Sequence, residues 1–189
     1  LPGFSVDHLA FAPGTSGVVG LFGVGNTGRV AHWDVTELDG NPSLSLRSEG
    51  TLTGSLRGVA IDPARALRYL TEESTGLYAG PYPSSELPTL RISTESPALP
   101  PLVGGLAIDV RSPGFIFVSS GLQGNIALFD RESPQSIPAL GISVLPAGTS
   151  NTPVSIGDLA FDHRSLGAAL PNGALVVASG TADPWAHVV

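Results

Sequence analysis

Residues 58–62 read Gly-Val-Ala-Ile-Asp, a short apolar segment with a central alanine that runs into a polar turn. The same pattern occurs three more times, at residues 8–12 (His-Leu-Ala-Phe-Ala), 105–109 (Gly-Leu-Ala-Ile-Asp) and 158–162 (Asp-Leu-Ala-Phe-Asp). The central alanines therefore recur about every 50 residues. A self-similar period of this size, made of strands and turns, predicts an all-β protein of the β-propeller class, whose four-stranded antiparallel blades surround a central channel.

Each unit continues in the same way after its first segment. A second apolar segment, rich in β-branched and aromatic residues, follows at 18–22, 67–71, 115–119 and 174–178. A third segment, opened by glycine and alternating in hydropathy, follows in three units, at 28–34, 76–78 and 124–130. We therefore expect one domain, residues 1–189, with about four blades in repeat units of roughly 1–48, 49–97, 98–147 and 148–189.

Charge and composition exclude several classes of partner. The chain has 9 basic residues, all of them arginine, against 16 acidic residues, and this net charge of −7 disfavours binding to nucleic acid. No apolar run is long enough for a membrane-spanning helix, so we expect no membrane partner. The absence of cysteine excludes disulfides and thiolate metal sites. Two proline-rich segments, 80–102 and 134–153, are expected to be connections between units or edge strands, because proline cannot donate to a sheet ladder.

A group of motifs, taken in chain order, resembles the β-propeller phytases, which are six-bladed, calcium-dependent enzymes that release phosphate from phytate. The motifs that carry the likeness are residues 3–5, 25–35, 56–62, 67–74, 103–108, 119–131 and 148–152. The resemblance implies that the chain supplies about the last four blades. Either it is a portion of a longer propeller or its units close as a smaller ring, and the place of residues 3–5 in the family pattern favours the portion.

The resemblance also implies a degenerate catalytic site. In the family, carboxylates around the channel hold calcium ions that bind the phosphates of the substrate and activate water. This chain keeps one of the acids, Glu73, whereas the other acidic positions hold Arg57, Leu102, Gly104, Ala147 and Pro153. We therefore expect a phytase-like propeller with weak or no hydrolysis of phytate, and calcium as the cofactor only if the chain is active.

Four residues are the candidates for this site. Arg57 either forms a structural ion pair with Glu73 or binds an anionic ligand directly through its planar donor fork. Asn26 replaces the hairpin lysine of the family and is the second candidate for binding substrate. Glu73 and Glu72 either hold one metal ion together or form a solvated pair at the end of a strand.

Two hypotheses about function remain open. The first is a calcium-dependent phosphoric monoester hydrolase, with phytate as its phosphorylated ligand. The alternative is a non-catalytic propeller that serves as a binding or structural module, whose partners are the remaining blades or a tandem propeller domain in a longer chain. The resemblance implies a secreted or periplasmic protein in either case.

Two further patterns have simple structural interpretations. Residues 23–28, Gly-Val-Gly-Asn-Thr-Gly, match the spelling of a dinucleotide-binding fingerprint, but residues 29–35 alternate like a strand where the fingerprint requires a helix. This pattern predicts a hairpin turn. Asp62, Asp109 and Asp162 recur at one place in three units, and we expect them to cap turns with their side chains.

Overall fold

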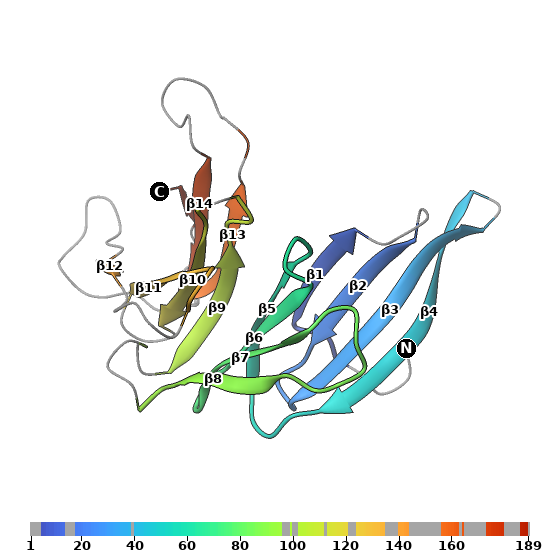
Figure 1. The fold of residues 1–189 in the computed structure, drawn as a ribbon, viewed down its shortest axis with the longest axis horizontal. Coiled ribbons are helices and arrows are strands. Elements are labelled where there is room, and N and C mark those ends of the chain that lie inside the picture. The colour runs from blue at the N-terminus through green and yellow to red at the C-terminus, as the bar shows by residue number, and fades with distance from the viewer. Residues whose placement is uncertain are drawn as a thin grey trace.

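The fold consists of four antiparallel sheets that follow one another along the chain (Figure 1). The structure is a computed structural model, and it describes residues 5–13, 18–38, 40–95, 99, 102–111, 113–120, 124–134, 140–143, 156–162, 164, 173–179 and 186–188. Three sheets have four strands and the last has three described strands, paired in chain order. The predicted all-β class and the four-stranded antiparallel sheets are confirmed. None of the sheets closes on itself within the described residues.

The strands of each sheet form a simple meander. Sheet 1 contains β1 (His8–Pro13), β2 (Val19–Val24), β3 (Arg29–Leu38) and β4 (Asn41–Thr51). Sheet 2 contains β5 (Leu56–Asp62), β6 (Leu67–Glu72), β7 (Gly76–Pro81) and β8 (Thr89–Ser93). Sheet 3 contains β9 (Val103–Ile108), β10 (Phe115–Ser120), β11 (Asn125–Asp130) and β12 (Leu140–Ser143). Sheet 4 contains β13 (Ile156–Asp162), β14 (Ala174–Ser179) and β15 (Ala186–Val188).

The first strands of the four sheets lie against one another. β1 contacts β5, β5 contacts β9, and β9 contacts β13, although about 50 residues separate each pair in the sequence. The later strands of each sheet lie progressively farther from this row (Figure 1). The outermost strands β8 and β12 fall inside the two proline-rich segments, as the prediction of edge strands there requires.

Alternation along the first strands explains the repeated alanine. Successive side chains of a strand point to opposite faces of its sheet. Val59 and Ile61 pack in a core shared with sheet 1, whereas Ala60, between them, packs in the core shared with sheet 3. In sheet 3, Leu106 likewise faces sheet 2 and Ala107 faces sheet 4. The small residue therefore lies on the face that meets the following sheet, while its larger neighbours contact the preceding one.

Two glycines allow these first strands to approach closely. A Cβ atom on Gly58 would lie 2.7 Å from Cβ of Leu106 and 2.8 Å from its backbone nitrogen, closer than real Cβ atoms come. A Cβ atom on Gly105 would lie 2.7 Å from Cα of Asp158 in the same way. Glycine is thus required where β5 meets β9 and where β9 meets β13.

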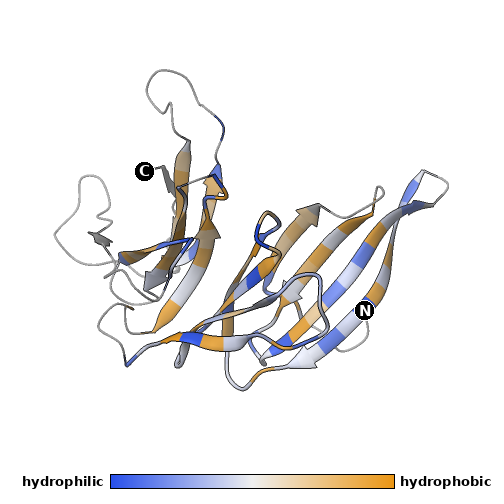
Figure 2. Cartoon of the chain, viewed as in Figure 1, coloured by the Kyte–Doolittle hydropathy of each residue, from blue (hydrophilic) through white to orange (hydrophobic). Residues whose placement is uncertain are grey.

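Apolar side chains from facing sheets form three cores along the row. Figure 2 shows hydrophobic residues distributed along the strands of all four sheets. The largest core joins sheets 2 and 3, and its fully buried members include Tyr69, Leu77, Ile116 and Phe129. Burial of such side chains contributes about 1.5–3 kcal/mol each, so the contacts between sheets are a main source of stability.

One face of β1 lacks this cover within the described structure. Leu9 and Phe11 are 55% and 68% exposed, whereas their counterparts in β5, Val59 and Ile61, are each 6% exposed. The four residues occupy the same alternate positions of the repeated motif. Sheet 1 therefore presents the apolar surface that sheet 2 buries against its predecessor.

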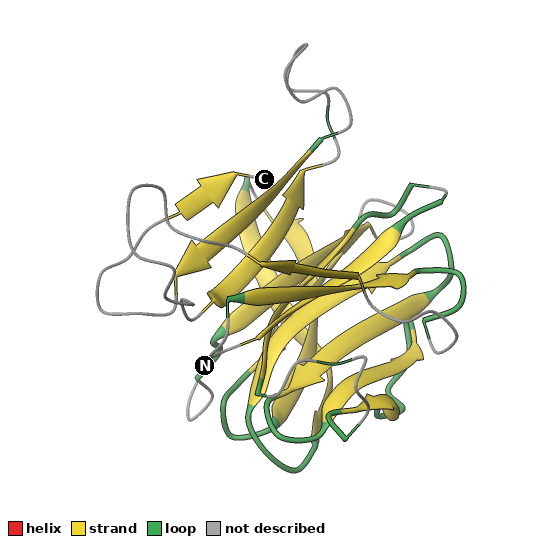
Figure 3. Ribbon diagram, turned by 90° about the vertical axis from the view of Figure 1, so that its left-hand side faces the viewer, coloured by secondary structure: helices red, strands yellow, loops and turns green. Residues whose placement is uncertain are grey.

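Strands and the turns between them make up the described part of the chain (Figure 3). None of the described residues belongs to a helix long and apolar enough to span a membrane.

Candidate functional site

A β-bulge at the start of β5 determines the position of Arg57. Leu56 pairs with Glu72 and Gly58 pairs with Thr71, which leaves Arg57 as an additional residue on its strand. The pairing of β13 with β14 shifts at the corresponding place, between Ile156 and Asp158. Bulges redirect side chains and are common next to functional sites. The side chain of Arg57 is thereby directed to the end of sheet 2, where the chain leaves β6.

Arg57 forms an ion pair with Glu73 at this end. Nη2 and Nε of Arg57 donate to Oε2 of Glu73 over 2.8 Å and 3.2 Å. Both side chains are partly exposed, and pairs of this kind contribute about 1 kcal/mol or less. The predicted pairing of the two residues is present. An anionic ligand would have to compete with Glu73 for the guanidinium group.

Glu72 is buried, which corrects the expectation of a solvated pair. It is 1% exposed, and its carboxylate accepts hydrogen bonds from two segments that lie outside the strand ladder. Oε1 accepts from the backbone N–H of Ser55 over 2.9 Å. Oε2 accepts from the backbone N–H groups of Ser74 and Thr75 over 3.1 Å and 2.7 Å, and from the Thr75 hydroxyl over 2.6 Å. Glu72 therefore satisfies the polar groups of the turn after β6, which would otherwise lack partners.

Neither carboxylate offers the oxygens that calcium requires. Calcium takes six to eight oxygen ligands, whereas four hydrogen-bond donors point at the Glu72 carboxylate and a guanidinium group covers one oxygen of Glu73. In the described ranges, no group of three or more acidic or histidine side chains comes close enough to hold a metal ion. Calcium at Glu72 and Glu73 stays a prediction from the resemblance, and this donor set does not fit it.

Asn26 lies in the turn between β2 and β3. Gly28 has a φ of 79° and its N–H donates to the carbonyl of Gly25 over 3.0 Å, so the predicted hairpin is confirmed and a strand follows it instead of a helix. The backbone N–H of Asn26 donates to Oδ2 of Asp7 over 2.6 Å. The carbonyl of Gly28 accepts from the N–H of Leu52 over 2.9 Å, which places this turn beside the segment that leads into β5. Asn26 and Arg57 thus lie at the same end of adjacent sheets, but no described contact joins them.

The recurring aspartates lie at the opposite end of the sheets and cap turns, as predicted. Oδ1 of Asp109 accepts from the backbone N–H of Arg111 over 3.1 Å, and the guanidinium group of the same arginine binds both carboxylate oxygens. Asp162 and Arg164 repeat this arrangement. The arginine two positions after the aspartate is a sequence signal that the analysis of single residues missed.

Asp62 differs because its cation comes from the next sheet. Oδ2 of Asp62 lies 3.0 Å from Nε of Arg131, which follows β11, and both side chains are buried. The guanidinium group of Arg131 also donates to the carbonyl oxygens of Val110 and Arg111. Sheets 2 and 3 are therefore joined at this end by a buried ion pair.

His32 is the buried histidine of sheet 1. Its ring stacks on Phe22 with a centroid separation of 4.0 Å and an interplanar angle of 20°. Burial lowers the pKa of His32, the positive charges of Arg47 and Arg68 lower it further, and Asp34 opposes the shift. A neutral ring in an aromatic stack is a packing element, so His32 does not belong to the candidate site.

A comparison of this chain with protein-family models found no match, and a comparison with curated protein sequences found none.

Proposed function

We propose that the chain is an arc of a β-propeller related to the phytases and that it serves as a non-catalytic module. The observation that carries this proposal is that both acids at the end of β6 already have bonding partners within the chain. Glu73 forms an ion pair with Arg57, and the carboxylate of Glu72 accepts hydrogen bonds from the turn that follows its strand and from Ser55.

The electrostatics of this end oppose metal-assisted hydrolysis. A calcium-dependent phosphatase needs carboxylates that neutralise the cation before the phosphate binds. Arg57 instead brings a guanidinium charge that is permanent at any physiological pH. This charge cancels that of Glu73 and repels a divalent cation. The same end can attract an anion but lacks the acidic ligands for calcium.

The propeller arrangement is supported by the way the sheets repeat. β5 and β9 each present larger side chains to the sheet before them and alanine to the sheet after them, so the same contact can continue beyond sheet 1. The exposed pair Leu9 and Phe11 matches the surface that Val59 and Ile61 bury. We therefore assign this face to contact with a further sheet of the same kind, and the module acts by completing a larger β-assembly.

Calorimetric titration of calcium into the purified chain, without and then with phytate, tests the proposal when phosphate release is assayed in the same samples. The expected results are no saturable calcium binding and no release above the blank. Arg57→Gln is the matched variant, because it removes the ion-pair partner of the Glu73 carboxylate and does not alter the backbone pairing of β5. Calcium-dependent release by the unmodified chain would overturn the proposal.

Sedimentation of the chain tests the role of the exposed face of β1 that carries Leu9 and Phe11, called here the β1 face. The double substitution Leu9→Ser and Phe11→Ser should reduce self-association in sedimentation. It should also reduce the binding of a dye that reports exposed apolar surface, and it should leave the midpoint of unfolding unchanged. Phe117→Ser, in the core between sheets 3 and 4, is the destabilising control. If the double substitution lowered stability as much as Phe117→Ser does, the β1 face would already be packed and its assignment would be wrong.

A further inference from the structure

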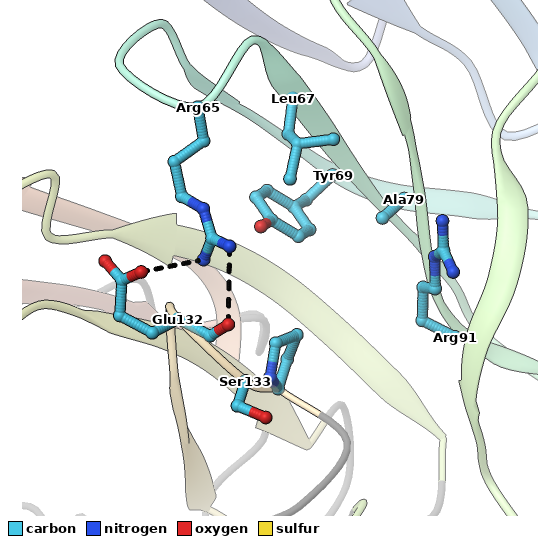
Figure 4. A pocket seen from close by; sticks show the side chains of 8 residues that line it. Arg65, Leu67, Tyr69, Ala79, Arg91, Glu132 and Ser133 are labelled. Atoms are coloured by element: carbon cyan, nitrogen blue, oxygen red, sulfur yellow. Dashed lines mark hydrogen bonds and ion pairs between the residues drawn. The ribbon is translucent and has the colours of Figure 1, made fainter.

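A cleft of about 250 Å³ lies between sheet 2 and the segment that follows β11, at the end of the sheets opposite to Arg57 (Figure 4). Its walls come from the β5–β6 turn, from β6, β7 and β8, and from the chain after β11. The residues that line it are Arg65, Leu67, Tyr69, Ala79, Arg91, Glu132, Ser133 and Pro134. We refer to it as the Tyr69 cleft. It is smaller than the roughly 300–1,000 Å³ typical of sites for drug-sized ligands, so its occupant must be small.

The hydroxyl of Tyr69 is directed into this cleft without a partner. Tyr69 is 1% exposed, its ring forms part of the core, and Figure 4 shows its oxygen pointing toward the guanidinium group of Arg65. Within the part of the chain that the structure describes, this hydroxyl makes no hydrogen bond. Burial raises the pKa of Tyr69, and although nearby arginines oppose this shift, the hydroxyl remains a donor at neutral pH. The hydroxyl borders the open cleft, so an acceptor atom placed there would receive its hydrogen bond.

Arg91 supplies a positive charge on the other side of the cleft. It extends from β8 and forms no ion pair or hydrogen bond with the described residues. Arg65, in contrast, already binds the carbonyl oxygens of Arg131 and Glu132 and lies 3.6 Å from the Glu132 carboxylate. The Glu132 charge is therefore offset by Arg65, and the charge of Arg91 remains for a ligand.

We propose that the Tyr69 cleft binds a small organic anion, a carboxylate or phosphate group carried on a compact and partly apolar body. Arg91 neutralises the anionic group, the Tyr69 hydroxyl donates to an acceptor on the ligand, and Leu67, Ala79 and Pro134 contact the apolar body. In a chain with a net charge of −7, an arginine with no described ion pair, across the cleft from the Tyr69 hydroxyl, is the feature that selects an anion.

Binding is tested by calorimetry and by amide chemical shifts of the intact chain, with benzoate and phenyl phosphate as probes. Inorganic phosphate tests the anionic group alone, and benzyl alcohol tests the apolar body alone. We expect at least one organic anion to bind with a dissociation constant of about 1 mM or lower, and both control compounds to bind about tenfold more weakly.

Three variants locate the site. Arg91→Gln should weaken binding of the organic anion about tenfold or more, because it removes the charged interaction with the anionic group. Tyr69→Phe should weaken binding about fivefold, because it removes one neutral hydrogen bond. Tyr69→Phe removes an oxygen that has no described partner, so its unfolding midpoint should be unchanged. Arg47→Gln, on the outermost strand of sheet 1, is the matched control and should bind as the unmodified chain does.

Three results would overturn the proposal. They are no saturable binding of either organic anion, equal affinity in the Arg91→Gln and unmodified chains, and equal affinity for the organic anions and either control compound. The calcium and phytate assay addresses the opposite end of the sheets. The two proposals can therefore fail independently of one another.

Discussion

Replacing Glu72 by glutamine should destabilise the fold strongly in the absence of any metal. The amide oxygen of Glu72→Gln can accept from the donors of Ser74 and Thr75, but its NH₂ group then faces the N–H of Ser55. Three hydrogen bonds change from a charged to a neutral acceptor, at about 1 kcal/mol each. The unsatisfied N–H adds a penalty that access of water to the partly exposed turn reduces. We expect a total loss of about 3 to 4 kcal/mol of the 5–15 kcal/mol typical of a domain.

Urea unfolding followed by circular dichroism, with EDTA present, measures this loss. Glu73→Gln is the matched control, since it removes the adjacent carboxylate and breaks one partly exposed ion pair, and it should cost about 1 kcal/mol or less. A loss below about 1 kcal/mol for Glu72→Gln, or equal losses for the two variants, would refute the structural role of Glu72. A loss that appears only when calcium is added would instead identify Glu72 as a metal ligand.

Three other predictions concern packing, charge and pH. Gly58→Ala should lower the free energy of unfolding by about 1–3 kcal/mol, because its Cβ would overlap Leu106; an unchanged thermal midpoint would show that β5 and β9 can separate without cost. Asp62→Asn should cost about 3–5 kcal/mol in urea unfolding, because the buried Arg131 keeps only the exposed carboxylate of Glu132, 3.6 Å away, as a counter-charge, and the added change Arg131→Met should recover part of the loss; no recovery would contradict the pairing. The pKa of His32 is lowered in the folded chain. As pH falls below about 6.5, His32 therefore binds a proton in the unfolded chain before it does so in the folded chain, and acidification lowers stability. The thermal midpoint of His32→Phe should therefore fall less than that of the unmodified chain between about pH 7.5 and pH 5.5, and parallel curves would exclude this contribution.

The strands were predictable because their signals are local and repeated. The motif around Ala60 recurs in every sheet and marks β1, β5, β9 and β13, and the glycine-opened segments mark β3, β7 and β11. The strand after the 23–28 motif was also predictable, because alternation of side chains is visible over seven residues. The outermost strands β8 and β12 are less regular, and the proline content indicated only an edge region.

The environment of the acids was not predictable from their neighbours in sequence. Glu72 and Glu73 are adjacent and look equivalent, yet one is buried and the other is partly exposed, because successive side chains at the end of β6 point in different directions. The donors that satisfy Glu72 include Ser55, from a different strand connection. Such a contact depends on how two sheet ends meet, which no local pattern encodes.

The Tyr69 cleft was missed for a related reason. Tyr69 lies in the segment 67–71, whose aromatic and β-branched residues are typical of a buried strand, and its ring is part of the core. The polar end of the same side chain becomes visible only when Arg91 and the chain after β11 are placed around it. Arg131 was likewise unremarkable in the sequence, because its acidic partner belongs to the preceding sheet.

The pair of Asp62 and Arg131 also bears on the order in which the chain matures on the ribosome. Asp62 leaves the exit tunnel with the first strand of sheet 2, whereas Arg131 emerges only after the third strand of sheet 3. Until then, the nascent second sheet holds this carboxylate with only the N–H of Arg65 in its own turn as a described partner. The buried contact that joins the two sheets can therefore form only after most of sheet 3 has been translated, whatever the order in which the strands of sheet 2 pair.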